Sequence, residues 1–193
     1  MNKFLLGLDL GQVLDYTALA IIEKIAEGNG EATYHLRHIQ RFPLKTTYPQ
    51  IVDNVCEIFN SDKISKYSKL IVDATGVGRP VVDLFKKKQI RPKAITITGG
   101  YDVIKDNGEY KVPKRDLVTN LQVVFQQEKL KIAEDLPEAK TLVQELLNFK
   151  VKIKDNARES FEAWREGIHD DLVLAVALAC WWGEKMDKKI EIW

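Results

Sequence analysis

The chain has 193 residues, of which 45% are hydrophobic and 30% are charged, and its formal net charge is +1. This composition suits one well-cored soluble domain, and the small net charge excludes an overall electrostatic attraction to nucleic acid, so any affinity for DNA must come from local patches. Cys56 and Cys180 form no CxxC pair, which argues for a reducing, intracellular setting. The longest apolar run, residues 172–182, is shorter than the roughly 20 residues of a membrane span, so no membrane contact is expected.

The N-terminal part of the chain predicts three antiparallel strands followed by alternating helices and strands. Near-continuous hydrophobicity over residues 3–10 indicates a central strand covered on both faces, and the glycines at 28 and 30 are typical of a hairpin turn. Helices are expected over 49–59 and, after the loop 76–80, through Lys88. The expected strands are 3–10, 17–22, 33–42, 70–72 and 94–98.

The C-terminal part predicts a hairpin and three helices. The turn Asp106-Asn107-Gly108 lies between two short strands, and we expect this hairpin to be an insertion that projects from the sheet. Helices are expected over 113–127, 137–148 and from about 170 to 186, with a short strand at 149–153. The order of elements predicts an α/β fold, a mixed five-stranded sheet flanked by helices.

Three acidic positions stand at the ends of buried elements. Asp9 ends the first strand, Asp73 ends the fourth, and Asp170-Asp171 opens the last helix. Taken singly, each acid is equally well explained as a turn or cap residue. If strands one and four are parallel neighbours, however, the acids meet at one sheet edge, where carboxylates repel one another unless cations neutralise them. Oxygen ligands favour Mg²⁺ or Mn²⁺, and two such ions about 3.5–4 Å apart can activate water and stabilise the leaving oxygen of a phosphodiester.

The segments around these acids resemble the nuclease domain of phage large terminases. The resemblance is carried by Gly7-Leu8-Asp9-Leu10-Gly11 with the following 15–19, by 72–83 and by 169–175, and it covers essentially the whole chain. It implies an RNase H-like fold, related to RuvC-type resolvases and integrases, and cleavage of concatemeric viral DNA during packaging with two Mg²⁺ or Mn²⁺ ions.

The resemblance also implies roles for individual residues. Asp9 and Asp73 would be the first two metal ligands, and Asp171 is preferred as the third because Asp170 is the better helix cap, with Asp170 assisting or substituting. Asp15 and His169 would lie just outside the ligands. Some relatives place a glutamate where Asp73 stands, and some carry another acid where this chain has Leu174, which leaves the ligand set of the second ion open.

The implied partners are double-stranded DNA, the terminase ATPase domain, the small terminase subunit and the portal, and the implied location is the host cytoplasm, as a virus-encoded or prophage protein. No GxxxxGK[S/T] phosphate-binding loop occurs in the sequence. We therefore expect residues 1–193 to form one nuclease domain without the ATPase domain, either an excised C-terminal part or a separately encoded nuclease.

The candidates for DNA contact are Arg79, in the glycine loop beside Asp73, and the basic residues of the hairpin and the following helix start: Lys105, Lys111, Lys114 and Arg115. Nothing in the sequence resembles a base-reading helix, so weak sequence preference is expected. Three alternatives remain: a Holliday-junction resolvase on the same fold, an actin-like or sugar-kinase phosphotransferase that lacks its second domain, and a module that docks DNA or a portal without cutting.

Overall fold

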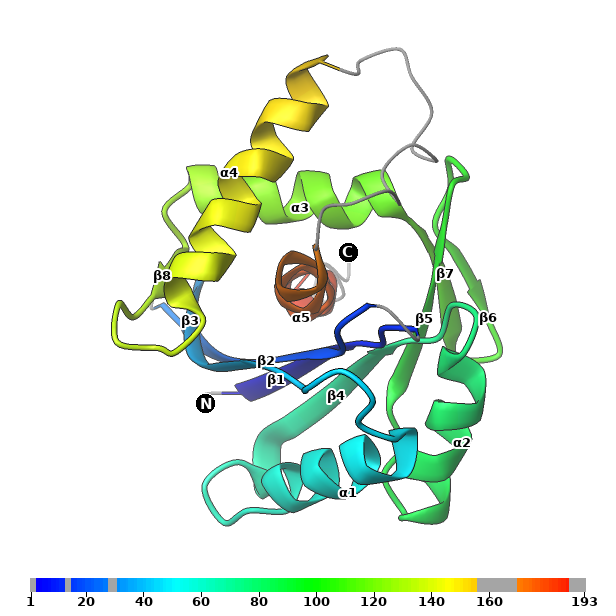
Figure 1. The fold of residues 1–193 in the computed structure, drawn as a ribbon. Coiled ribbons are helices and arrows are strands. Elements are labelled where there is room, and N and C mark those ends of the chain that lie inside the picture. Colours follow the sequence, from blue (N-terminus) through cyan, green and yellow to red (C-terminus); the bar gives the residue numbers. More distant parts are fainter. Residues whose placement is uncertain (1–2, 13–14, 28–30, 156–169, 188–193) are drawn as a thin grey trace, which may run out of the picture.

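The computed structural model describes residues 3–12, 15–27, 31–155 and 170–187, which form one mixed sheet with helices on both faces (Figure 1). The strands are β1 (Lys3–Asp9), β2 (Ala18–Ala26), β3 (Ala32–Arg41), β4 (Ser68–Asp73), β5 (Lys93–Thr98), β6 (Ile104–Asp106), β7 (Glu109–Pro113) and β8 (Leu130–Ile132). The helices are α1 (Tyr48–Phe59), α2 (Gly78–Lys87), α3 (Lys114–Gln126), α4 (Ala139–Asp155) and α5 (Asp171–Asp187), and a 3₁₀ turn forms at Ser65–Tyr67.

The strand directions bring six carboxyl ends, those of β1, β3, β4, β5, β7 and β8, to the same edge of the sheet. The strand order is β6-β7-β5-β4-β1-β2-β3-β8. β1, β4, β5 and β7 are successive parallel neighbours, and β3 runs the same way because β2 is antiparallel to both β1 and β3. In this register Ala18 lies opposite Asp9 on one side and Arg41 on the other. The last residues of β1 and β3 therefore share one row across the sheet, and their side chains point to the same face.

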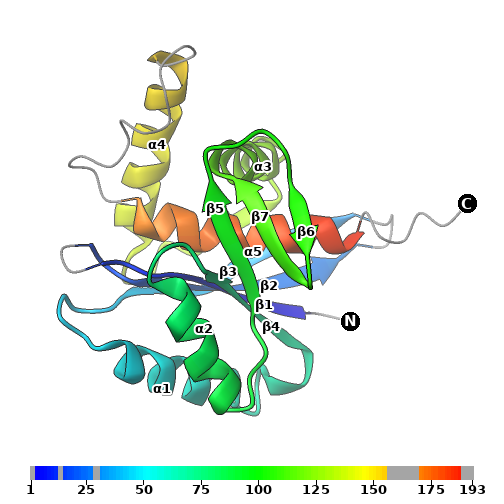
Figure 2. The same cartoon turned by 90° about the vertical axis from the view of Figure 1, so that its right-hand side faces the viewer.

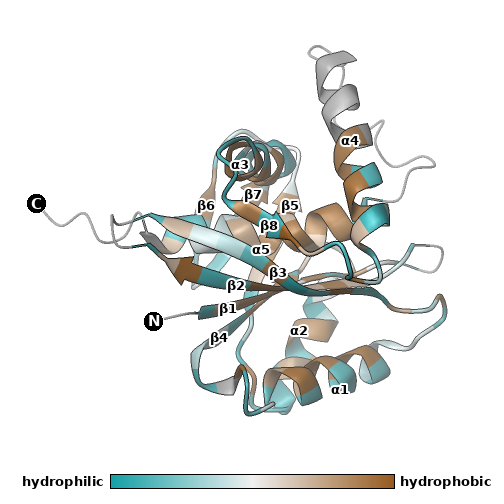
Figure 3. Ribbon diagram, turned by 90° about the vertical axis from the view of Figure 1, so that its left-hand side faces the viewer, coloured by the Kyte–Doolittle hydropathy of each residue, from teal (hydrophilic) through white to brown (hydrophobic). Residues whose placement is uncertain are grey.

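Two apolar clusters cover the two faces of the sheet. α1 and α2 pack on one face, and α5 lies on the other with α3 and α4 outside it (Figures 1 and 2). Hydrophobic residues follow the inner strands and α5, as the hydropathy colouring in Figure 3 shows. Residues 171–183 of α5 are all buried, which is why this helix is apolar on every side. No helix in the described ranges is long and apolar enough to cross a membrane.

Gly7 allows α5 to lie directly against β1. A Cβ built on Gly7 would overlap the backbone carbonyl oxygen of Ala175 and would lie 3.2 Å from the backbone nitrogen of Ala179. Only a residue without a side chain fits this approach. Because Gly7 is two residues before Asp9, the same contact fixes how closely the first turn of α5 lies to the end of β1.

We expect Gly7→Ala to lower the free energy of unfolding by roughly 1–3 kcal/mol, the usual cost of overpacking, because α5 must move away from β1. Urea unfolding measures this loss. Gly99→Ala is the matched control, since a Cβ at Gly99 has nothing within 4 Å. Equal stability of the two variants would contradict the close packing of α5 on β1.

The structure changes three details of the predicted architecture. The sheet has eight strands rather than five, since the hairpin of β6 and β7 extends it instead of projecting from it (Figure 2). Burial of Tyr110 on Trp181 and Trp182, with ring centroids 5.8 and 5.5 Å away, holds β7 in the sheet. β8 was not predicted because its three residues are defined by pairing with distant β3. Residues 149–153 are helical, because five alternating residues do not stop a helix already formed upstream.

The remaining elements agree with the sequence expectations to within a few residues. The three antiparallel strands, the alternating helices and strands and the buried last helix are confirmed. The predicted turn at 28–30 lies outside the described residues.

Candidate active site

Asp9 and Asp73 lie side by side at the sheet edge where β1 and β4 end. Leu8 pairs with Val72 in parallel register, and each strand ends on the next residue. Both aspartates belong to the sheet face that α5 covers, since their alternate neighbours Leu5 and Ile71 pack in the cluster beneath that helix. The sequence prediction that these two acids meet at one edge is confirmed.

The surroundings of Asp9 disfavour its negative charge. Burial and then the charges of Asp73, Asp170 and Asp171 raise the pKa of Asp9 well above its ordinary range, while the charge of Lys114 acts in the opposite direction. Asp9 is only 8% exposed. All four acids named from the sequence thus lie close enough for their charges to act on one buried carboxyl.

Asp73 is oriented by its own turn. Its Oδ1 accepts hydrogen bonds from the backbone nitrogen of Thr75 at 2.8 Å and from the Thr75 hydroxyl at 2.5 Å. The same hydroxyl oxygen accepts from the backbone nitrogen of Ile97 in β5 at 2.9 Å. Burial raises the pKa of Asp73, opposed first by the hydrogen bonds from Thr75, then by one from Asp9 and by the charge of Lys114. Thr75 therefore fixes the carboxylate relative to two strands.

The two aspartates at the start of α5 point to different cations. Asp170 precedes the helix, and its carbonyl accepts from the backbone nitrogen of Leu174 at 2.9 Å. Its carboxylate Oδ2, however, lies 2.7 Å from the Lys114 ammonium. Asp171, the first helical residue, accepts two hydrogen bonds from Arg41. Its Oδ2 accepts from Nε at 2.6 Å, and its Oδ1 accepts from Nη2 at 3.2 Å.

Arg41 holds a second acid, Glu145, and so forms the centre of a buried charge cluster with Asp171. Its Nη2 also donates to Glu145 Oε1, and the guanidinium lies over the ring of Tyr16, 5.2 Å from the centroid. Glu145 Oε2 accepts from the backbone nitrogen of Val173 at 3.3 Å, so a side chain from α4 caps α5. Burial disfavours the charge on Arg41, but the hydrogen bond and charge of Asp171 and the charge of Glu145 outweigh it and raise the pKa of Arg41.

Arg41, Glu145 and Thr75 were not foreseen from the sequence. Glu145 left a signal: it shares a spacing of three with the buried residues Ala139 and Leu142, and an acid in an apolar stripe needs a partner. Arg41 has no such signal in the sequence, because only the strand register places it in the row of Asp9.

Burial and then the charge of Asp171 raise the pKa of Glu145 from its usual 4.5 to about 7. The folded protein therefore holds this proton more tightly than the unfolded chain, and the stability supplied by Glu145 is lost as pH rises from 4.5 to about 7. We expect the stability of Glu145→Gln relative to wild type to increase over this window and then level off, measured by urea unfolding in EDTA. Glu134→Gln, at an exposed site, should show a constant difference. A constant difference for Glu145→Gln as well would contradict the raised pKa.

Neither a protein-family model nor a curated protein matches this sequence, but solved structures do. The large terminase nuclease of thermophilic phage G20c aligns with a TM-score of 0.59 and 16% identity, over 92% of this chain and 81% of that one. The Mn-soaked terminase nuclease domain of human cytomegalovirus aligns with a TM-score of 0.59 and 14% identity, over 96% and 86%. This chain has the fold of the large terminase nucleases. The large terminase of another thermophilic bacteriophage also aligns, with a TM-score of 0.54 and 13% identity, over 91% of this chain and 38% of that one.

At these identities the likeness establishes the fold, and the expected RNase H-like α/β architecture is confirmed. In this terminase nuclease fold the donor chemistry at the edge fits a hard divalent cation, because Asp9, Asp73, Asp170 and Asp171 offer only carboxylate oxygens. Among the residues that the structure describes, no three His, Cys, Asp or Glu side chains are grouped so that they could hold one metal ion. Asp170 and Asp171 are paired with Lys114 and Arg41 instead.

The candidate DNA-contacting residues of this terminase-like fold divide into two groups. Lys105 and Lys111 are exposed on β6 and β7. The other three make contacts within the protein. Arg79 pairs with Glu109 at 2.6 Å, and Lys114 pairs with Asp170. Arg115 donates to the carbonyl of Tyr101 at 2.7 Å and lies over its ring, 4.6 Å from the centroid.

Of the two residues expected just outside the metal ligands, the structure describes only Asp15. Asp15 is exposed, and its backbone nitrogen donates to the Gln12 carbonyl at 2.6 Å in the loop after β1. His169 lies outside the described residues.

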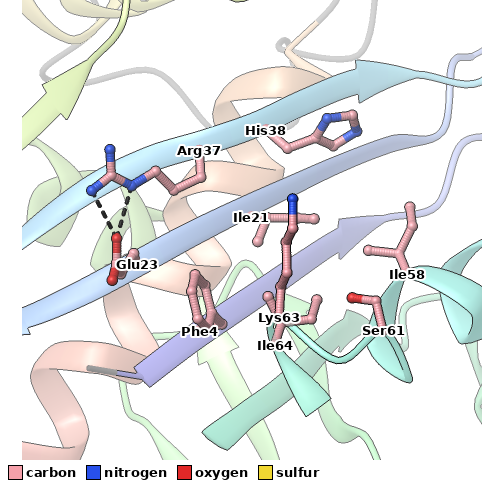
Figure 4. A pocket seen from close by; sticks show the side chains of 9 residues that line it. All are labelled: Phe4, Ile21, Glu23, Arg37, His38, Ile58, Ser61, Lys63 and Ile64. Carbon is pink, nitrogen blue, oxygen red and sulfur yellow. Dashed lines mark hydrogen bonds and ion pairs between the residues drawn. The ribbon is translucent and has the colours of Figure 1, made fainter. Parts of the chain in front are cut away.

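A separate pocket of about 560 Å³ opens on the α1 face of the sheet (Figure 4). Its floor is apolar, and the ion pair between Arg37 and Glu23, 2.7 Å apart, lies at its rim. The lining residues are Phe4, Ile21, Glu23, Arg37, His38, Ile58, Ser61, Lys63 and Ile64. None of them is one of the four site acids, and Phe4, Ile21 and Ile64 pack in the cluster of the opposite face, so the pocket is distinct from the candidate active site.

Proposed function

We propose that this chain is a divalent-metal-dependent endodeoxyribonuclease that cuts concatemeric viral DNA during genome packaging. The observation that carries the proposal is the meeting of the buried Asp9 with the partly buried Asp73, with the acids of α5 near them on a terminase nuclease fold. Desolvated carboxylates at such short range are costly unless a cation joins them. A site whose carboxylates are stabilised by cations, near the exposed Lys105 and Lys111 of the hairpin, suits the polyanionic backbone of DNA.

We assign Asp9 and Asp73 as the first two metal ligands, and Asp170 in preference to Asp171 as the third. Both carboxylate oxygens of Asp171 accept from Arg41. Asp170 affects the pKa of Asp9 more strongly than Asp171 does, and its partner Lys114 is a flexible side chain. This assignment reverses the sequence-based preference, which depended on Asp170 capping α5, whereas Glu145 supplies a cap.

The protein's own residues would orient the site. When bound, two Mg²⁺ or Mn²⁺ ions would activate water and neutralise charge on the phosphodiester. Thr75 holds Asp73 in a single orientation, and Arg41 with Glu145 fixes the first turn of α5. Lys105 and Lys111 would contact DNA phosphates along the hairpin, and little sequence preference should result because phosphate contacts carry no base information.

The packaging partners belong to the same proposal. We infer that the ATPase domain of a large terminase, the small terminase subunit and the portal work with this nuclease in the host cytoplasm. This chain aligns with only 38% of the second phage's large terminase, which leaves room in such a protein for further domains.

Digestion of plasmid DNA tests the proposal. With Mg²⁺ or Mn²⁺ we expect nicking and linearisation without sequence preference, and with EDTA no cleavage. Asp73→Ala should abolish cleavage, whereas Asp102→Ala, at an exposed residue before β6, should leave it unchanged. DNA binding without any metal-dependent cutting would favour a docking module, and preferential cutting of four-way junctions over linear duplex would favour a resolvase.

A further inference from the structure

Lys114 reaches the acidic sheet edge for a topological reason. β7 is parallel to β5, and Pro113, the last residue of β7, pairs with Thr98, the last residue of β5. Since β5 is parallel to β4, and β4 to β1, the residue after β7 lies at the edge where Asp9 and Asp73 end their strands. Lys114 begins α3 at this point. A lysine expected on the DNA-binding rim is thus turned toward the acids.

The ammonium of Lys114 pairs with one acid at the start of α5 and lies at the edge that carries the acids of β1 and β4. Its Nζ lies 2.7 Å from Asp170 Oδ2, and the two side chains are only 19% and 25% exposed. The strand register also places Lys114 at the sheet edge where Asp9 and Asp73 end β1 and β4. Ion pairs at this degree of burial are screened less by salt than surface pairs. The ammonium of Lys114 is therefore a shared positive charge for the acids at this edge.

We propose that Lys114 is an internal counter-cation of the active site. Its ammonium pairs with Asp170 in the metal-free protein and is displaced when a divalent cation binds Asp9, Asp73 and Asp170. This inference rests on the proposed function of the same residues as metal ligands. One ammonium leaves three carboxylates only partly neutralised, so a doubly charged ion has more to gain there.

The different chemistry of Arg41, which pairs with Asp171, and Lys114, which pairs with Asp170, supports the proposal that only Lys114 is displaced. Arg41 binds Asp171 through two donors and is also held by Glu145 and the Tyr16 ring, so its position is fixed. A lysine ammonium is a compact charge on a flexible four-carbon chain, and it can withdraw without a backbone change. Withdrawal of Lys114 releases Asp170 and leaves the ammonium beside the site, within reach of a phosphate.

Removal of the Lys114 charge should strengthen metal binding. A divalent cation entering among the acids is repelled by the nearby ammonium and must compete with it for Asp170. We expect Lys114→Met to bind Mn²⁺ about tenfold more tightly than wild type, and its melting temperature to be lower in EDTA but to rise more on addition of Mn²⁺.

The test is Mn²⁺ titration followed by electron paramagnetic resonance of the free ion, together with thermal unfolding. Lys87→Met removes the same charge from an exposed position on α2 and should bind Mn²⁺ as wild type does. Lys114→Arg keeps the charge and should stay near wild type, which also covers the case in which Lys114→Met folds poorly.

The outcomes separate this inference from the proposed function. If wild type binds Mn²⁺ and cleaves DNA but Lys114→Met has unchanged or weaker affinity, Lys114 is only a structural link between α3 and α5, and this inference alone fails. If wild type neither binds Mn²⁺ nor cleaves, the proposed function fails and takes the inference with it.

Discussion

Replacement of Asp9 by asparagine should abolish DNA cleavage and, at the same time, stabilise the metal-free protein. The loss of a metal ligand and of its charge should lower the cleavage rate by roughly 10²–10³-fold or more. The gain in stability follows from the raised pKa of Asp9, whose ionised form is disfavoured by burial and by Asp73, Asp170 and Asp171. An uncharged amide of the same shape avoids this repulsion, so we expect an increase of about 1 kcal/mol in the free energy of unfolding in EDTA.

The two effects have opposite signs, and a general folding defect cannot produce both. Cleavage is measured on plasmid DNA with Mn²⁺, and stability by urea unfolding in EDTA at neutral pH. Asp83→Asn, at an exposed position on α2 where Asp83 pairs with Lys86, should change neither property appreciably. A destabilised Asp9→Asn protein would show that the acids at this edge are not in conflict, and retained cleavage would show that Asp9 is not a ligand.

Replacement of Arg41 by methionine should cause the largest loss of stability among the substitutions considered. Asp171 and Glu145 would both lose their cation while remaining mostly buried, with side chains only 7% exposed. Removal of one partner from such a buried pair typically costs about 3–5 kcal/mol. The first turn of α5 would lose its anchor to β3, so cleavage should fall as well.

Arg37→Met is the matched control for Arg41→Met. It lies on the same strand, but its side chain is 51% exposed and its ion pair with Glu23 should contribute less than about 1 kcal/mol. Urea unfolding compares the two. In the double variant Arg41→Met with Glu145→Gln, part of the lost stability should return, because glutamine is neutral without having to take up a proton. Equal losses for Arg41→Met and Arg37→Met would contradict the role of the buried cluster.

The acids of the site could be found from the sequence because their signals are local. Asp9 and Asp73 each follow an uninterrupted apolar strand, and Asp170 and Asp171 open the most apolar helix. The charges that hold these acids could not be found in this way. Arg41 ends a strand of ordinary appearance, and only the pairing of β2 with both β1 and β3 places it in the same row of the sheet as Asp9.

The same distinction explains the hairpin and Lys114. The turn at Asn107 and Gly108, both with positive φ, was readily predicted, but the partner of β7 is β5, and the intervening sequence does not specify that contact. Once β7 joins the sheet, Lys114 must lie at the acidic edge rather than on a projecting arm. An error in the predicted pairing of β7 therefore changes the interpretation of Lys114.

Crystals soaked in Mn²⁺ and measured at the manganese absorption edge test the central claim most directly. The account predicts an anomalous peak between the carboxylates of Asp9 and Asp73, with Asp170 turned away from Lys114 and toward the ion. Manganese bound only elsewhere, or an empty space between Asp9 and Asp73 at a concentration that supports DNA cleavage, would contradict it.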